Sequence, residues 1–107
     1  MDGIANFSPA WSEIPDKPDW VDFERQLAYM KGEMLDVEEA TTGNERSLKK
    51  FAHIAEEVAD VMLAGWTLLN LMERMDACPT DDFANKTMLF CHLKNNRRGY
   101  HNDKKRV

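Results

Sequence analysis

Two pairs of acidic residues have the spacing of a divalent metal site: Glu33 with Asp36, and Glu57 with Asp60. Each pair is spaced i, i+3, so at ~100° per residue its carboxylates lie about 60° apart on one helix edge. Carboxylates gathered where two helices meet repel one another and lose hydration, which a divalent cation offsets. An all-oxygen ligand set suits Mg²⁺ or Mn²⁺ and leaves positions open for water and phosphates. The spacing therefore indicates a metal site, with a solvated helix edge as the alternative.

Two long helices are predicted to position these pairs, because apolar residues recur there in steps of three and four. The first begins near Asp19, a suitable N-cap, and ends before the glycine-containing turn at 41–44. The second begins at Asn44 or Ser47 and runs to about Met75. Both acidic pairs border the apolar stripe of their helix, so the hairpin is expected to bring them to one junction.

A shorter third helix is predicted from about Thr80, as its N-cap, to Arg97. The predicted fold is all-α, a bundle of two long antiparallel helices plus this shorter C-terminal helix. From Val61 onward the second helix is apolar on most of its circumference, and a two-helix hairpin cannot cover such a surface. We therefore expect homo-oligomerisation to complete a four-helix bundle.

The 107 residues form one domain, 1–107, with an irregular N-terminal arm over 1–18 and a flexible basic tail over 99–107. The net charge of −5 is unevenly distributed. Residues 93–107 hold six Lys and Arg against one Asp, a net +5, so that residues 1–92 carry −10. An acidic body repels the phosphate backbone, so nucleic acid is not an expected partner.

A cytoplasmic location is expected. The most apolar run, 61–72, is shorter than the ~20 residues that cross a bilayer, and no basic segment with an apolar core marks a signal peptide. Cys78 and Cys91 do not make a disulfide framework and are expected to stay reduced.

The acidic motifs resemble those of the MazG-like all-alpha nucleoside triphosphate pyrophosphohydrolases, whose pattern is Glu-x-x-Glu on one helix and Glu-x-x-Asp on the next. The closer match is the stretch 56–61, Glu-Glu-Val-Ala-Asp-Val. In the first motif, Asp36 stands where the family usually has glutamate, and a competing register pairs Asp36 with Glu39. The segment 95–100, Asn-Asn-Arg-Arg-Gly-Tyr, resembles the family's basic segment after the third helix.

The resemblance implies Mg²⁺-dependent hydrolysis of nucleoside triphosphates to the monophosphate and pyrophosphate, with Mn²⁺ as a second suitable ion. It also implies dimers or dimers of dimers. The implied metal ligands, also catalytic, are Glu33, Asp36, Glu57 and Asp60. Glu56 or Glu39 is expected to orient the attacking water, and Lys94, Asn95, Arg98 and Tyr100 to bind phosphates. The alternative function is a non-catalytic helical dimer that serves as a protein-interaction module.

Overall fold

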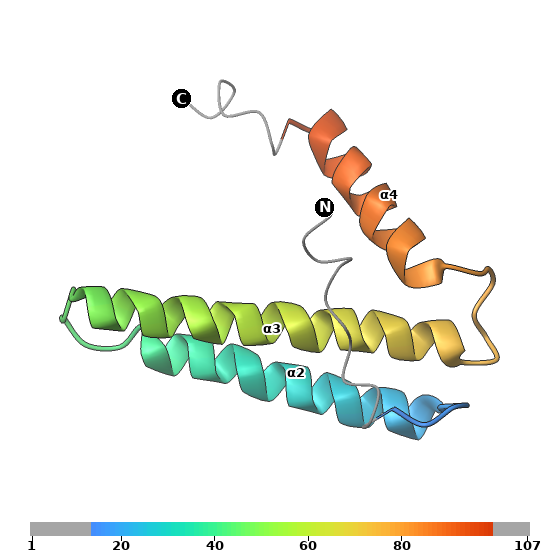
Figure 1. Ribbon diagram of the computed structural model, residues 1–107, viewed down its shortest axis with the longest axis horizontal. Coiled ribbons are helices and arrows are strands. Elements are labelled where there is room, and N and C mark those ends of the chain that lie inside the picture. Colours follow the sequence, from blue (N-terminus) through green and yellow to red (C-terminus); the bar gives the residue numbers. More distant parts are fainter. Residues whose placement is uncertain (1–13, 100–107) are drawn as a thin grey trace.

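The computed structural model describes residues 14–99, and within them the chain forms three helices and no strand. Helices α2 (Trp20–Ala40) and α3 (Leu48–Arg74) pair as an antiparallel hairpin, and α4 (Phe83–Arg97) follows after a loop (Figure 1). The predicted all-α class, with two long helices and a shorter third, is confirmed. All of the predicted basic tail except Gly99, and most of the predicted N-terminal arm, lie outside the described residues. No described helix is long and apolar enough to traverse a bilayer.

The N-terminus of α2 is capped as expected from the sequence. The Asp19 carboxylate accepts hydrogen bonds from the backbone N–H of Val21 at 3.0 Å and of Asp22 at 3.1 Å. In return, the Asp22 carboxylate accepts from the backbone N–H of Asp19 at 2.9 Å, which completes a capping box. These bonds also hold the pKa of Asp19 below its ordinary value, the backbone donor of Asp22 contributing most.

The hairpin turn also follows the sequence prediction. Gly43 adopts a positive φ of 82°, the left-handed conformation that a glycine takes without a steric penalty. Of the two predicted starts for α3, the structure selects Ser47, whose hydroxyl accepts from the backbone N–H of Lys50 at 3.1 Å. The turn residues therefore determine where the two helices can pair.

The predicted start of the third helix is wrong: the N-cap position of α4 is Asp82 instead of Thr80, and the Asp82 side chain makes no capping hydrogen bond. Asp82 has φ 57°, and this left-handed residue prevents the helix from extending further back. The Thr80 hydroxyl instead accepts from the Lys86 ammonium at 3.0 Å. A side chain of α3 supplies the missing cap, since the Glu73 carboxylate accepts from the backbone N–H of Ala84 at 2.8 Å.

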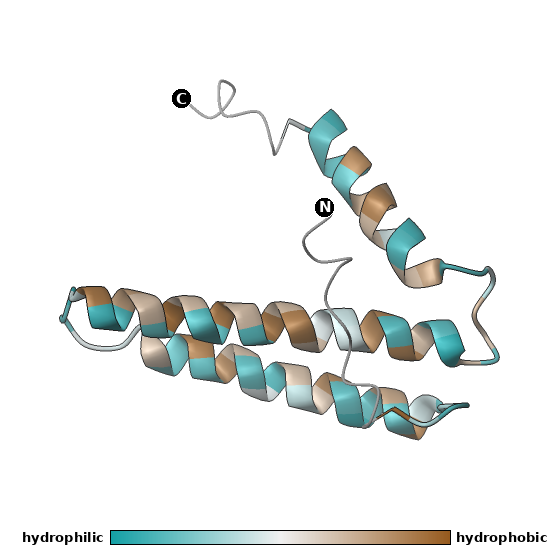
Figure 2. Cartoon of the chain, viewed as in Figure 1, coloured by the Kyte–Doolittle hydropathy of each residue, from teal (hydrophilic) through white to brown (hydrophobic). Residues whose placement is uncertain are grey.

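The core is small and lies at one end of the hairpin. Ile14, Leu71 and Met75 form its buried cluster, against which Phe23 and Met72 pack. No residue of α2 is buried, and the buried residues of α3 all fall in its second half: Ala64, Trp66, Thr67, Asn70 and Leu71. Apolar residues nevertheless continue along much of α3 (Figure 2). In the described part of the chain, much of the apolar surface of α3 thus remains exposed.

Replacing Gly32 by alanine should raise the free energy of unfolding by about 0.5–1 kcal/mol, because alanine loses less backbone entropy within a helix. Gly32 lies inside α2, and an added Cβ would meet nothing within 4 Å. Gly65→Ala is the matched control, since there the Cβ would lie 3.3 Å from the Met30 methyl carbon, and its gain should be smaller or absent. Urea unfolding measures both. A loss of stability in Gly32→Ala would contradict an open surface at this position.

Candidate metal centre

Three carboxylates from two helices meet beside the hairpin junction. Glu33 and Asp36 come from α2 and Glu57 from α3, and one oxygen of each lies within 4.8 Å of the others. Glu33 and Glu57 are half-buried, whereas Asp36 is exposed. The i, i+3 spacing on α2 places its two carboxylates on the edge that borders α3, as predicted. The arrangement offers oxygen ligands from both helices to one cation.

Asp60 and Glu39 stand at the margins of this group. Asp60 is exposed and is not among the three carboxylates that meet, although its charge still raises the pKa of Glu57. Glu39 lines the adjacent groove with Asp36 but is not part of the group either. Of the two registers considered for α2, the structure therefore brings Glu33, and not Glu39, together with Asp36 and Glu57.

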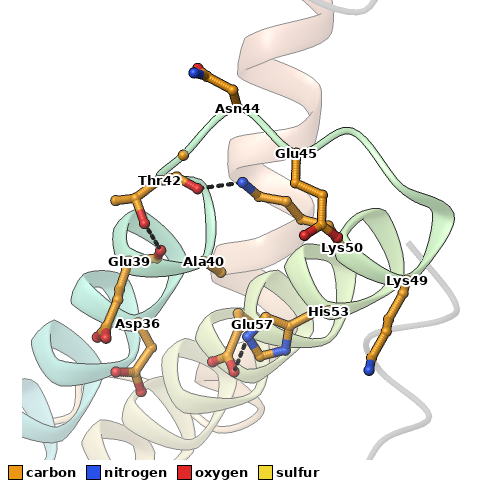
Figure 3. Close-up of a pocket in the computed structure, with 11 residues that line it drawn as sticks. Asp36, Glu39, Ala40, Thr42, Asn44, Glu45, Lys49, Lys50, His53 and Glu57 are labelled. Atoms are coloured by element: carbon orange, nitrogen blue, oxygen red, sulfur yellow. Dashed lines mark hydrogen bonds and ion pairs between the residues drawn. The ribbon is translucent and has the colours of Figure 1, made fainter.

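An open groove of about 760 Å³ lies at the turn end of the hairpin and is lined by two of the three carboxylates, Asp36 and Glu57. Figure 3 shows Asp36 and Glu57 close together, with the turn residues on the far side of the groove. The full lining comprises Asp36, Glu39, Ala40, Thr42, Gly43, Asn44, Glu45, Lys49, Lys50, His53 and Glu57. Binding pockets for small molecules commonly measure ~300–1,000 Å³, so the groove could hold one.

The cations of this groove, Lys49 and Lys50, were not among the residues predicted for the site. The Lys50 ammonium donates to the backbone carbonyl of Thr42, which places it over the turn (Figure 3). A signal for Lys50 existed in the sequence, because it precedes Glu57 by seven residues, a spacing that returns to the same helix face. Both lysines could offset negative charge on a ligand bound in the groove.

The environment of Glu57 disfavours its ionised form and raises its pKa. Burial is the largest cause, followed by the charge of Asp36, and Asp60 and Glu33 add to the effect. His53 acts in the opposite direction. Its Nε2 lies 3.9 Å from Glu57 Oε1, but the histidine side chain is 56% exposed, so this ion pair is weak. Among residues 14–99, His53 therefore offsets the effect of the neighbouring carboxylates on Glu57 only in part.

This raised pKa predicts a pH dependence of stability when metal is absent. A carboxyl whose pKa is higher in the folded than in the unfolded state binds more protons when folded. Its contribution to the free energy of unfolding is therefore fully present below the unfolded pKa, ~4.3 for glutamate. The contribution is lost as the pH rises through the folded value. Glu57→Gln should therefore gain stability relative to the wild type as the pH rises over that interval.

The measurement is the difference in free energy of unfolding between wild type and Glu57→Gln, in EDTA, from pH 4 to pH 8. The comparison cancels groups such as Asp19, whose lowered pKa has the opposite effect and stabilises the fold above the unfolded value. A difference that does not change with pH would contradict the electrostatic account of Glu57.

The other residues predicted for the site lie apart from it. Glu56 is exposed and lines neither the carboxylate group nor the groove. Lys94, Asn95 and Arg98 belong to the C-terminal end of α4, and none of them lines the groove. The Lys94 ammonium lies 5.9 Å from the centroid of the Phe90 ring on its own helix. Tyr100 lies outside the described residues.

Comparison of the chain with models of known protein families, with curated proteins and with solved structures gives no match. The resemblance to the MazG-like enzymes therefore rests on the acidic motifs of the sequence. The geometry of the carboxylates stands as an observation independent of that resemblance.

Proposed function

We propose that the protein is a Mg²⁺-dependent nucleoside triphosphate pyrophosphohydrolase of the MazG-like kind. The observation that carries the proposal is the meeting of Glu33, Asp36 and Glu57 beside an open groove. Three carboxylates held this close without a cation repel one another, and the pKa of Glu57 is raised, first by burial and then by the charge of Asp36. Like charges gathered in this way favour the binding of a cation between them.

The donors fit Mg²⁺ or Mn²⁺ better than zinc. All three are carboxylate oxygens, the ligands that hard cations prefer, and the one nearby imidazole among the described residues, that of His53, pairs with Glu57. Asp60, one turn beyond Glu57 on α3, is proposed as the fourth ligand. Bound there, the cation would supply neutralisation of the triphosphate charge.

The protein's own residues have separate tasks in this proposal. The groove binds the triphosphate, and Lys49 and Lys50 offset its charge. A carboxylate outside the metal ligands, Glu39 in the groove or Glu56 on α3, orients the attacking water and accepts its proton. The water opens the bond between the α- and β-phosphoryl groups, giving nucleoside monophosphate and pyrophosphate. Lys94, Asn95, Arg98 and Tyr100 remain proposed phosphate ligands.

The proposal includes a homo-oligomer, either a dimer or a dimer of dimers, in which hairpins pair as four-helix bundles. Four exposed side chains, here called the apolar flank, support it: Met34, Phe51, Val58 and Met62. At ~100° per residue, Val58 and Met62 point about 100° and 140° away from Glu57 around α3, so pairing through them leaves the carboxylates accessible. A cytoplasmic location fits the activity, because nucleotides are abundant there and Cys78 and Cys91 are free.

The apolar flank equally favours the second candidate function, a non-catalytic helical dimer that acts as a protein-interaction module. An exposed apolar strip on a small domain marks an interaction surface whether or not the acidic edge binds a metal. The two functions differ in the role of the carboxylates, since the interaction module requires none of them.

The deciding experiment incubates the purified chain with each of the eight common NTPs and dNTPs, in Mg²⁺, Mn²⁺ or EDTA, and measures pyrophosphate. We expect metal-dependent release from at least one nucleotide, with a melting temperature that rises with metal concentration. Self-association with neither pyrophosphate nor a metal-linked rise would assign the protein to the interaction-module function. The same screen identifies the preferred base and sugar.

A further inference from the structure

The C-terminal end of α4 cannot serve the groove of its own chain in the observed arrangement. The groove adjoins the first turns of α3, at residues 49–57, whereas α4 is joined to the last turn of α3. The segment of α3 from Glu57 to Arg74 is about 26 Å long at ~1.5 Å per residue. Over its own 15 residues, about 22 Å, α4 diverges from α3, so its end lies away from the hairpin (Figure 1).

The exposed face of α4 combines apolar and basic residues. Leu89, Phe90 and Leu93 are 50–59% exposed, although they recur at helical spacing on one side. The cations Lys94, Arg97 and Arg98 lie at the end of the same helix. Among residues 14–99, no carboxylate forms an ion pair with Lys94, Arg97 or Arg98. A face of this composition fits a partner that is apolar in part and acidic.

The acidic edge of the hairpin matches the cations of this face in charge. With His53 neutral, the residues that line the groove carry a net −2, since Asp36, Glu39, Glu45 and Glu57 outnumber Lys49 and Lys50. The exposed face of α4 therefore has its complement in charge on the molecule itself, at a place that α4 does not reach within its own chain. A symmetric pair of copies could satisfy both contacts at once, because each would offer one basic end and one acidic groove.

We propose that the basic end of α4, through Lys94 and Arg98, docks at the acidic groove of a second copy of this chain. Charge complementarity selects the second copy over other occupants of the exposed face. The contact itself does not depend on catalysis. Its consequence for the site rests on the proposed function: the incoming cations would lower the negative potential of a groove that otherwise repels a triphosphate.

A charge exchange between two variants tests the contact without reference to turnover. The first variant, Lys94→Glu with Arg98→Glu, reverses the helix end, and the second, Asp36→Lys with Glu39→Lys, reverses the groove. In either variant alone the docked groups carry like charges, whereas in a mixed pair both contacts join opposite charges. Sedimentation equilibrium at low salt, over a concentration series, gives the dissociation constant of each protein and of the equimolar mixture.

Matched controls carry the same change in net charge at exposed positions elsewhere: Lys17→Glu with Lys31→Glu for the first variant, and Glu24→Lys with Glu38→Lys for the second. We expect each test variant to dissociate with a constant about tenfold or more above that of its control, and the mixture to return to the wild-type constant. All eight substitutions lie on the surface or at partly exposed positions, so each variant should keep its helices. Circular dichroism checks that it does.

Three results would overturn the proposal: a wild type that is monomeric throughout, test variants that match their controls, or a mixture that stays dissociated. None of them depends on the enzyme assay. Absence of pyrophosphate release by the wild type would instead count against the proposed function and leave the α4 contact standing.

Discussion

Glu57→Gln should reduce metal-dependent pyrophosphate release by about 100-fold or more, the loss expected when a ligand of a catalytic cation is removed. Glu57 is the carboxylate that α3 contributes to the group of three, so without its charge the ion keeps the two carboxylates of α2 and, of the ligands proposed on α3, only Asp60. The amide is close in size to the carboxylate, which keeps the packing of this half-buried side chain. Steady-state kinetics over a range of Mg²⁺ concentrations measures the effect.

The same variant should be more stable than the wild type when metal is absent. Burial and the charge of Asp36 disfavour the ionised form of Glu57, and glutamine removes that conflict. In EDTA, Glu57→Gln should therefore melt at a higher temperature, and added Mg²⁺ should raise its melting temperature less than that of the wild type. Loss of a metal ligand should thus lower activity while raising the stability of the metal-free protein, whereas damage to the fold would lower both.

Glu38→Gln serves as the control for this experiment, because Glu38 is exposed on α2 and belongs to neither the carboxylate group nor the groove. It should retain the wild-type activity and the wild-type response to Mg²⁺. If Glu57→Gln retained full turnover, the pyrophosphohydrolase site would have to lie elsewhere in the protein.

Met62→Glu should raise the dissociation constant of the homo-oligomer by about 100-fold or more, since an unpaired charge buried at an interface costs several kcal/mol. Met62 lies near the middle of α3 and is 50% exposed in the single chain, so its replacement by glutamate places no charge inside the core of that chain. Sedimentation velocity over a concentration series should show smaller species than for the wild type.

Leu63→Glu is the matched control for the apolar flank. It introduces the same charge one residue further along α3, where the side chain points ~100° away from Met62. Leu63 is also exposed, at 39%. Similar dissociation of both variants would indicate that α3 pairs through another face, and wild-type association of Met62→Glu would remove the apolar flank from the interface.

Local signals in the sequence were sufficient for the hairpin. A capping aspartate at 19, a capping serine at 47 and a left-handed glycine at 43 act within one turn of the chain, and the structure uses all three. The start of α4 was mispredicted because it depends on a long-range cap, the Glu73 carboxylate, and on a left-handed aspartate. Neither a cap donated by another helix nor a left-handed non-glycine residue is evident from local spacing.

Helical spacing predicts which edge of a helix each site residue occupies, and the rest of the site was not predictable from the sequence. Spacing placed Glu33, Asp36, Glu57 and Asp60 on two helix edges, but how far each side chain stands from the opposite helix depends on how the helices pack. Asp60 therefore shares the predicted edge without joining the three carboxylates that meet. The separation of α4 from the turn end of the hairpin, visible in Figure 1, depends on the direction in which a loop leaves α3, and no residue pattern encodes that direction.

The uneven burial along α3 has a consequence for the dynamics of the hairpin. Its buried residues begin at Ala64, whereas Glu57 and the groove lie in the half that has none. Segments with few buried apolar contacts open by local unfolding at a small free-energy cost, so amide protons over 51–60 should exchange with solvent sooner than those over 64–71. Any ion or molecule that binds the turn end of the hairpin would oppose this local unfolding and slow the exchange of these amide protons. Recognition and ordering of this end of the hairpin would then be one thermodynamic event.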